Sequence, residues 1–260
     1  MSRAGENPVA PDQMTKTVIV VPCFNEANRL APEAFRDFAR DWCLGVFLFV
    51  DDGSTDNTLP VLTALQKSAP GSFAVLKLPH NVGKAEAVRQ GFLEAFRLTP
   101  ECVGFWDADL ATPLDAVPLF EAVLQDRPQT DIVLGARVQL LGRNIRRRAF
   151  RHYLGRGFAT AVATVLSVDV YDSQCGAKMF RVTDTVRDLF DRPFLSRWIF
   201  DVEILARFIN AKRRQGVPRP EALLYELPLP SWRDVGGSKL RAKDFVIAVF
   251  DLVRIYRSLQ

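Results

Sequence analysis

Cysteine is scarce in this sequence, with four residues among 260 and no Cys-x-x-Cys spacing between them. Scattered cysteines without paired spacing argue against a zinc site and against a disulfide-stapled fold. We therefore expect buried free thiols in a protein that works in a reducing compartment. The four thiols are those of Cys23, Cys43, Cys102 and Cys175.

Long apolar runs are also missing. The longest clear run near the C-terminus covers residues 245–250 and is bracketed by Asp244 and Asp251, whereas a membrane-spanning helix needs about 20 apolar residues. Residues 1–16 are polar, contain proline and include no apolar core of the kind that signal peptides carry. We expect a flexible tail over 1–16, neither a signal peptide nor a transmembrane segment, and a cytoplasmic location.

The chain shows no internal repeat and no low-complexity linker. Its composition, 48% hydrophobic and 25% charged, is typical of a folded globular protein rather than a disordered one. We expect a single domain over residues 17–260.

Apolar β-type runs alternate with amphipathic stretches along most of the domain. This alternation predicts an α/β fold with a mainly parallel sheet flanked by helices. Strands are expected at residues 17–21, 45–50, 73–78, 102–106, 131–135 and 223–227. Helices are expected at 31–42, 57–68, 85–96 (capped by Asn81), 113–124 (with Pro113 in its first turn), 146–166, 183–191, 199–213 and 240–258, with polar loops at 172–178 and 231–239.

Three of these strands end in loops that carry acids, namely Glu26, then Asp51 and Asp52, then Asp107 and Asp109. The carboxyl ends of parallel strands meet at one edge of the sheet, where ligands bind. We therefore expect these acids to converge. This convergence is stronger evidence for a binding site than any single motif.

The pair Asp107 and Asp109 follows the buried run 102–106, and buried acids require a partner. In an extended backbone, two residues separated by one point to the same side. Two carboxylates on one side suit a hard divalent ion, Mg²⁺ or Mn²⁺, that keeps positions open for substrate phosphates. The alternative is a pair of turn or capping acids, because Asp-x-Asp by itself is common.

A basic block lies at residues 143–156, which contain six arginines and no acid, although the net charge of the whole chain is only +4. Such a block indicates an anionic partner: nucleic acid, membrane lipid or a phosphate ligand. The aromatic residues that would stack on bases are few, only Phe150 and Tyr153, and no nucleic-acid motif is present. We expect no nucleic-acid partner.

Four strings in order carry a resemblance: VPCFNE at 21–26, VDDGSTD at 50–56, NVGK at 81–84 and DAD at 107–109. Together they resemble the family 2 glycosyltransferases with the GT-A fold. The strings DSQCGAK at 172–178, RWIFDVE at 197–203 and the segment 232–240 are similar to the dolichyl-phosphate β-glucosyltransferase branch. The resemblance covers roughly residues 17–258 and implies inverting transfer of glucose from UDP-glucose to a polyprenyl phosphate, with Mg²⁺ or Mn²⁺.

The resemblance also implies roles for individual residues. It makes 17–135 the nucleotide-sugar half and 136–260 the acceptor half. The metal on the diphosphate would be held by Asp107 and Asp109. The uracil or ribose would lie against Asp52 with Pro22, Phe24 and Glu26, and Lys84 at a helix start would bind the nucleotide. Taken alone, Asp52 is a turn acid and Lys84 a solvated lysine.

A phosphate acceptor is largely dianionic at neutral pH, so it needs cations more than a base. The resemblance places Arg137, Arg151 and Arg233 at phosphate-binding positions, and Lys239 is a further cation in a loop. For a hydroxyl acceptor a base would be needed, and Asp201 or Glu203 is the candidate, although both are also typical helix-start acids. The residues expected at the reaction centre are Asp107, Asp109, Arg137 and Asp201.

Two positions depart from the family patterns. Related mannosyl-phosphate-lipid synthases often carry a metal-binding Gln where this chain has Ala111, which favours the glucosyl branch and leaves the ion fewer protein ligands. The usual Gly-Phe-Lys is Gly-Ala-Lys here, with Ala177 in the middle. The alternatives are a GDP-mannose-dependent enzyme, a transferase with a hydroxyl acceptor, and a non-catalytic nucleotide or RNA binder.

A polyprenyl acceptor resides in a bilayer, so the protein would have to reach a membrane surface. The expected helices at 143–168 and 239–258 are partly basic and amphipathic, as are helices that lie in the lipid interface. The alternative is ordinary packing on the sheet or in a dimer. The resemblance therefore predicts a peripheral protein on the inner face of the membrane, of unknown oligomeric state.

Overall fold

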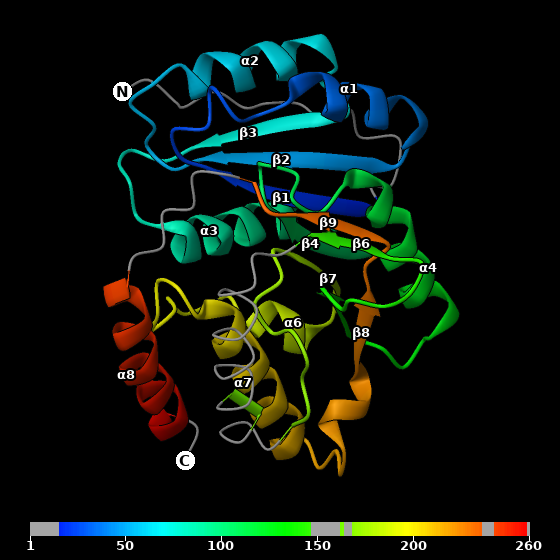
Figure 1. Ribbon diagram of the computed structural model, residues 1–260, viewed down its shortest axis with the longest axis vertical. Helices are drawn as coiled ribbons and strands as arrows, with labels where there is room; N and C mark the ends of the chain where they lie inside the picture. The colour runs from blue at the N-terminus through cyan, green and yellow to red at the C-terminus, as the bar shows by residue number, and fades with distance from the viewer. Residues whose placement is uncertain (1–15, 147–161, 164–167, 236–241, 259–260) are drawn as a thin grey trace.

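The computed structural model describes residues 16–146, 162–163, 168–235 and 242–258 (Figure 1). Within these ranges a seven-stranded sheet has the order β3-β2-β1-β4-β7-β5-β8. Its strands are β1 (Thr17–Cys23), β2 (Gly45–Asp51), β3 (Phe73–Lys77), β4 (Cys102–Trp106), β5 (Ile132–Ala136), β7 (Ala177–Arg181) and β8 (Leu224–Pro228). The expected mixed α/β fold with a mostly parallel sheet is confirmed.

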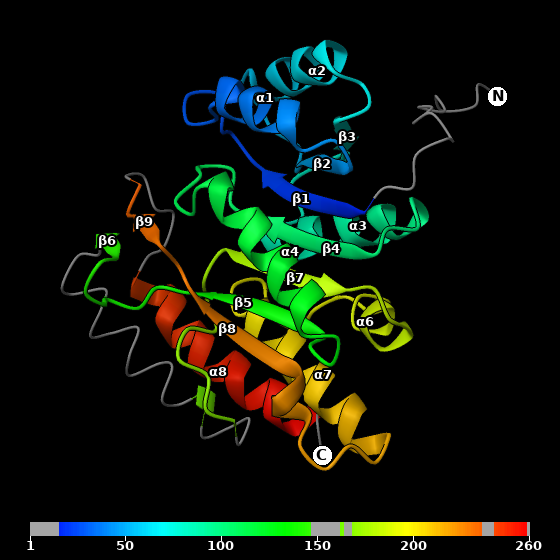
Figure 2. The same cartoon turned by 90° about the vertical axis from the view of Figure 1, so that its right-hand side faces the viewer.

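The sheet is covered on both faces by helices (Figure 2). The helices are α1 (Pro32–Asp41), α2 (Thr58–Ser68), α3 (Lys84–Arg97), α4 (Val117–Asp126), α6 (Asp184–Asp188), α7 (Phe200–Arg214) and α8 (Ala242–Ser258), with 3-10 turns η1 (Leu114–Ala116) and η2 (Pro220–Leu223). Alternate side chains of β1 enter opposite cores: Val18 and Val20 pack with α3 and α7, whereas Ile19 and Val21 pack with α1, α2 and α4. A strand buried on both faces explains the continuous apolar runs in the sequence.

Strand β7 was not expected, because 172–178 was assigned to a loop. It inserts antiparallel between β4 and β5, with Trp106 opposite Ala177. Its sequence AKMFR contains no β-branched residue, so its strand character comes from pairing on both sides rather than from local propensity. As a result the loop before β7 ends beside the end of β4, where the Asp107 amide donates to the Gly176 carbonyl at 3.0 Å.

A second, two-stranded sheet pairs β6 (Asn144–Arg146) with β9 (Ser231–Arg233) in parallel. This β6–β9 ribbon lies at one side of the molecule (Figure 2). It corrects two expectations: Arg146 is in a strand rather than at a helix start, and residues 231–233 are not loop. Most of the helix expected at 146–166 falls outside the described residues.

Three local expectations were wrong. Helix α3 begins after Gly83, whose φ of 94° closes the turn, and the Asn81 side chain does not cap it. Pro113 precedes the 3-10 turn η1, and Pro118 is the proline in the first turn of α4. Of the thiols, Cys43 is exposed rather than buried.

The other three thiols are shielded from solvent to different degrees. Cys23 and Cys175 are buried, and burial raises the pKa of the Cys102 thiol to about 11. In the described part of the chain, no helix combines the length and the apolar character needed to cross a bilayer.

Candidate active site

The acid-bearing loops after β1, β2 and β4 lie at the same edge of the sheet, as expected from the parallel pairing of these strands. In the register, Cys23 pairs with Asp51, so the loop at 24–26 starts level with Asp52. The loops after β1 and β2 are tied together: the Glu26 amide donates to Thr58 Oγ1 at 2.8 Å and the Thr55 amide to Asn25 Oδ1 at 2.8 Å. This edge is the candidate site.

Each carboxylate of the Asp-x-Asp motif has a cationic partner. Asp107 Oδ1 is 2.5 Å from Lys84 Nζ, and Asp109 Oδ2 is 2.7 Å from Arg29 Nη2. Both acids are partly exposed, so they remain accessible from solvent. Leu110, with φ at 50°, turns the backbone sharply after the motif. The Ala111 amide donates to Asp109 Oδ1 at 3.1 Å.

Gly176 packs directly against Asp107 and fixes its position. A Cβ at position 176 would lie 1.8 Å from Asp107 Oδ2, a distance that no two atoms without a bond can adopt. The same glycine accepts the Asp107 amide hydrogen through its carbonyl. The close approach of the β7 loop to the motif therefore requires glycine at this position.

The two carboxylates of the Asp-x-Asp motif could hold a hard divalent cation. Asp107 and Asp109 offer carboxylate oxygens, which Mg²⁺ and Mn²⁺ prefer. Ala111 cannot ligate, and among the described residues no group of three or more His, Cys, Asp or Glu side chains could hold a metal. An ion here would take only these two carboxylates from the protein and would rely on ligand oxygens for the rest.

Lys84 is the first residue of α3, where the helix dipole also favours an anion. Burial by itself would lower the pKa of Lys84, but the carboxylates of Asp107, Asp201 and Asp109 outweigh burial and raise it. The ammonium group therefore stays charged at neutral pH. The charged ammonium group can exchange its ion pair with Asp107 for one with a phosphate oxygen.

Asp52 organises the loop that leads into α3. Its buried carboxylate accepts hydrogen bonds from the Val82 amide at 2.7 Å and from the Gly83 amide and Asn81 Nδ2 at 3.0 Å. Burial raises the pKa of Asp52, and the two backbone amides lower it in part. Asp52 thus fixes the turn that presents Lys84, and its proposed contact with a base or ribose remains a prediction.

Arg137 follows β5 and is held by Asp172. Its Nε and Nη2 donate to the two Asp172 oxygens at 2.6 and 2.7 Å. Its Cζ lies 5.2 Å from the centre of the Trp232 ring. Burial would lower the pKa of Arg137, but Asp172 raises it. Asp172 is itself positioned by Glu226, which accepts the Asp172 amide hydrogen at 2.8 Å.

Six further residues that the sequence singled out remain to be placed. Arg233 is exposed, and its amide donates to the Ala111 carbonyl at 3.1 Å, which brings β9 against the motif turn. Arg151 and Lys239 lie outside the described residues. Pro22, Phe24 and Glu26 are partly buried at the end of β1, which is the side of the site nearest Asp52.

Comparison with known proteins decides the family. Residues 18–185 match the description Glycosyl transferase family 2. This chain belongs to glycosyl transferase family 2. A dolichyl-phosphate β-glucosyltransferase of Trichomonas vaginalis is 30% identical over 254 residues, covering 92% of this chain and 70% of that protein. The Saccharomyces cerevisiae enzyme of the same description is 32% identical over 270 residues, covering 92% and 76%.

The solved structures similar to this glycosyltransferase share its fold. Glucosyl-3-phosphoglycerate synthase of Mycobacterium tuberculosis with UDP has a TM-score of 0.65 at 17% identity, covering 100% of this chain and 86% of that one. The same enzyme with Mn²⁺, UDP-glucose and phosphoglyceric acid has a TM-score of 0.64 at 19% identity, covering 93% and 80%. The expected GT-A fold and glycosyltransferase class are confirmed.

Asp201 and Glu203 of the transferase are buried and bound to other protein groups. Asp201 Oδ1 is 2.7 Å from Lys178 Nζ, which also donates to the Cys175 carbonyl. Glu203 accepts from the Leu195 amide at 2.7 Å and pairs with Arg207. The sequence indicated both acids but not these partners.

The sequence also did not single out Lys178 and Arg29. Lys178 lies in a string quoted for other residues and Arg29 lies outside all the quoted strings, and only their distance to a carboxylate distinguishes them. Asp172 was quoted for the family pattern but not recognised as the partner of Arg137. Long-range ion pairs of this kind leave no periodic signal in a sequence.

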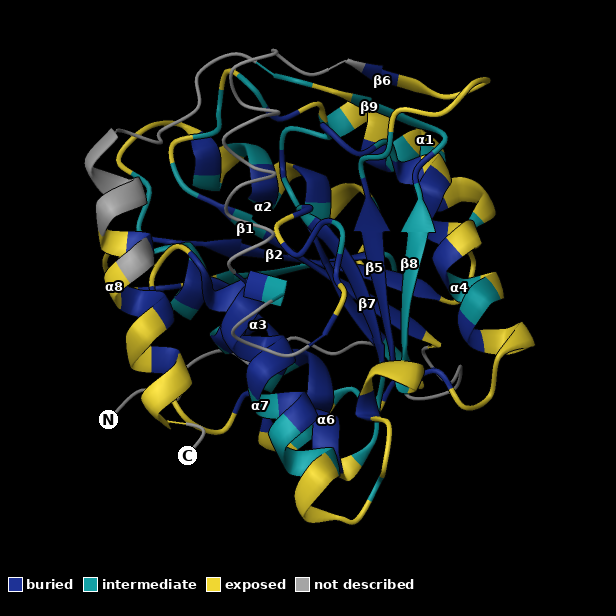
Figure 3. Cartoon of the chain, turned by 60° about the horizontal axis from the view of Figure 1, so that its bottom comes forward, coloured by how far each residue is buried: buried dark blue, intermediate teal, exposed yellow. Residues whose placement is uncertain are grey.

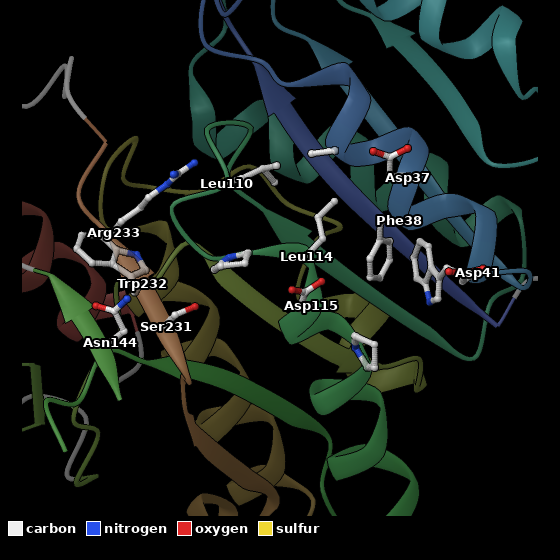
Figure 4. A pocket seen from close by; sticks show the side chains of 14 residues that line it. Asp37, Phe38, Asp41, Leu110, Leu114, Asp115, Asn144, Ser231, Trp232 and Arg233 are labelled. Atoms are coloured by element: carbon white, nitrogen blue, oxygen red, sulfur yellow. The ribbon is translucent and has the colours of Figure 1, made fainter. Parts of the chain in front are cut away.

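A groove lies beside this site, between α1 and the β6–β9 ribbon. The groove has a volume of about 920 Å³. Figure 4 shows Arg233 and Trp232 of the β6–β9 ribbon at one end, Phe38 of α1 at the other, and Leu110 between them. Its lining includes none of Asp107, Asp109 and Lys84. The groove therefore lies next to the sheet edge but does not contain its paired acids and lysine.

Proposed function

We propose that this transferase moves glucose from UDP-glucose to the phosphate of a polyprenyl lipid, with inversion and with a divalent metal. The observation that carries the proposal is the pairing of Asp107 with Lys84 at 2.5 Å at the edge where β1, β2 and β4 end. This arrangement offers carboxylates to a metal and a cation to a diphosphate. The names of the relatives support glucose and dolichyl phosphate, and the Mn²⁺ and UDP-glucose of the solved neighbour support the donor and the ion.

On the donor side, Asp107 and Asp109 would hold Mg²⁺ or Mn²⁺ against the diphosphate. When bound, such an ion supplies a Lewis acid that neutralises the charge developing on the leaving UDP. Lys84 would move from Asp107 to a diphosphate oxygen. Asp52, with Pro22, Phe24 and Glu26, would bind the uracil or the ribose.

On the acceptor side, a phosphate dianion must approach a site already rich in anions. Cations near its path therefore contribute more than a base would. Arg233 has an exposed side chain beside the motif turn, and Arg137 is held by Asp172 behind Trp232. The pairing of Asp201 with Lys178 disfavours Asp201 as a base and hence disfavours a hydroxyl acceptor.

The decisive experiment offers UDP-glucose, UDP-galactose and GDP-mannose to the purified chain with polyprenyl phosphate or 3-phosphoglycerate, each with Mn²⁺ or with a chelator. We expect lipid-linked glucose only with UDP-glucose, polyprenyl phosphate and metal. In the same assay Arg233→Ala should raise KM for the lipid phosphate about tenfold, the size of one charge-assisted contact, and leave KM for UDP-glucose unchanged. Arg97→Ala, which removes an exposed arginine at the far end of α3, is the matched control.

Product from 3-phosphoglycerate alone would replace the lipid acceptor by a soluble hydroxyl. Product from GDP-mannose would replace the glucosyl assignment. Equal rates of sugar transfer with Mn²⁺ and with the chelator would contradict the proposed metal dependence. Equal rises of both KM values in Arg233→Ala would remove Arg233 from the acceptor side.

We further propose that α8 holds the transferase at the inner membrane surface, where the lipid acceptor resides. One face of α8 is buried through Ala248, Leu252 and Ile255, whereas Phe250 and Val253 on the opposite face are exposed (Figure 3). Arg254 and Arg257 are exposed on the same helix. Apolar side chains beside arginines favour the interface of an anionic bilayer.

Phe250→Glu combined with Val253→Glu should reduce co-sedimentation with phosphatidylglycerol vesicles about tenfold or more, because it places two charges where apolar groups enter the interface. Leu119→Glu on α4, where the leucine is 41% exposed compared with 45% for Val253, should have no effect. Unchanged sedimentation of the α8 variant would rule this surface out.

A further inference from the structure

We propose that Arg29 neutralises Asp109 when no metal is bound. A divalent ion would displace Arg29 from Asp109 only when it binds together with a nucleotide diphosphate. Arg29 would thereby couple metal binding to nucleotide binding. This inference rests on the proposed function, because it requires a metal at Asp107 and Asp109. It adds a residue that no family motif in the sequence indicated.

The position of Arg29 is determined by the fold rather than by chance contact at the surface. The Arg29 and Leu30 amides both donate to the Glu26 carbonyl at 2.8 Å, which forms a tight turn after β1. The Glu26 amide is anchored on Thr58, and Glu26 Oε2 lies 3.4 Å from Arg29 Nε. The guanidinium is thus held from behind while Nη2 reaches Asp109, 80 residues further along the chain.

Each carboxylate of the motif already has a cationic partner without a metal, although Arg29 also contacts Glu26. Arg29 on Asp109 and Lys84 on Asp107 give two cations for two carboxylates. A bare divalent ion would have to break at least the Arg29–Asp109 pair and would then lie beside a guanidinium that Glu26 holds near the site. Like charges at such a distance repel each other. Metal binding by the protein alone is therefore weakened.

A diphosphate changes this balance. Its oxygens supply the ligands that Ala111 cannot, and they offer new partners for the guanidinium and for the Lys84 ammonium. The two carboxylates are then released to the ion. Since coupling between two ligands is reciprocal, the metal must strengthen nucleotide binding by the same factor as the nucleotide strengthens metal binding.

The test is a titration of the full chain with Mn²⁺, followed by electron paramagnetic resonance of the free ion, with and without UDP. Arg29→Gln should tighten Mn²⁺ binding in the absence of UDP about fivefold, the size of one partly exposed ion pair. It should also shrink the gain in Mn²⁺ affinity that UDP brings. Arg29→Lys, which keeps the charge, should stay near the unaltered chain.

Arg36→Gln is the matched control, because Arg36 forms a similar close pair with Glu33 on the neighbouring helix α1 at 2.6 Å. It should leave both Mn²⁺ affinities unchanged. Arg29→Met serves as a second variant that keeps the apolar stem should the glutamine variant unfold. Thermal melting of each variant shows whether the fold is retained.

One outcome would overturn the role of Arg29 and leave the proposed function intact. In that outcome the unaltered chain binds Mn²⁺ with UDP, but Arg29→Gln and Arg29→Met both bind Mn²⁺ without UDP no more tightly than the unaltered chain does. Absence of Mn²⁺ binding by the unaltered chain even with UDP would overturn the metal assignment itself, and the inference with it. The two failures are therefore distinguishable.

Discussion

Asp109→Asn is expected to lower the rate of glucose transfer about a thousandfold, equivalent to about 4 kcal/mol of transition-state stabilisation. The amide keeps the shape of the side chain but removes one of only two carboxylates that the described residues offer to an ion. It also leaves the Arg29 guanidinium without its 2.7 Å carboxylate contact. Single-turnover transfer from UDP-glucose to polyprenyl phosphate measures the loss directly.

The control for this prediction is Asp115→Asn, which removes an exposed carboxylate on η1, a few residues beyond the motif. It should change the rate less than twofold, because a solvated charge at the surface contributes little. Mn²⁺ titration should show weakened binding for Asp109→Asn alone. Full activity of Asp109→Asn would mean that Asp109 does not hold the metal.

Lys178→Met is expected to lower the free energy of unfolding by about 3–5 kcal/mol. Lys178 is fully buried in β7, and its Nζ lies 2.7 Å from Asp201 Oδ1 and 5.2 Å from the centre of the Phe105 ring. Methionine fills a similar volume but leaves the Asp201 carboxylate buried without the lysine charge. Urea denaturation followed by circular dichroism measures the change.

The double variant Lys178→Met/Asp201→Asn should lose clearly less stability than the sum of the two single variants, because it removes the uncompensated charge. Arg254→Met is the control: its pair with Asp251 is 3.4 Å long and the arginine is 60% exposed, so the loss should be below about 1 kcal/mol. Strict additivity of the two single changes would show that the pair is not coupled. Sugar transfer retained by the double variant would exclude Asp201 as an essential base.

The central edge of the site was predictable because it depends on local patterns. Runs such as 17–21, 45–50 and 102–106 are buried on both faces and therefore appear as continuous apolar segments. Parallel strands joined by helices bring their carboxyl ends together, so the acids after these runs had to converge. The same reasoning predicted the positions of Asp52 and of the Asp107–Asp109 pair without coordinates.

Other parts of the fold could not be predicted from local pattern. Strand β7 is too short and too mixed in composition to be recognised, and it forms because β4 and β5 each offer it a partner. The β6–β9 ribbon likewise joins three residues to three others that lie more than 80 positions away. In both cases pairing at long range outweighs local propensity.

By itself, the sequence determined the α/β architecture, the order of the acid-bearing loops and the family, because these follow from periodicity and from motifs that are continuous in the chain. The tertiary structure alone decided how the charges are paired: Arg29 with Asp109, Lys84 with Asp107, and Lys178 with Asp201. The physical reason is that an ion pair depends on a distance of a few ångströms between side chains, and many arginines and lysines in this sequence would satisfy the same charge rule. The antiparallel entry of β7, the turn after β1 and the turn that Asp52 holds before α3 select which of them reach the acids.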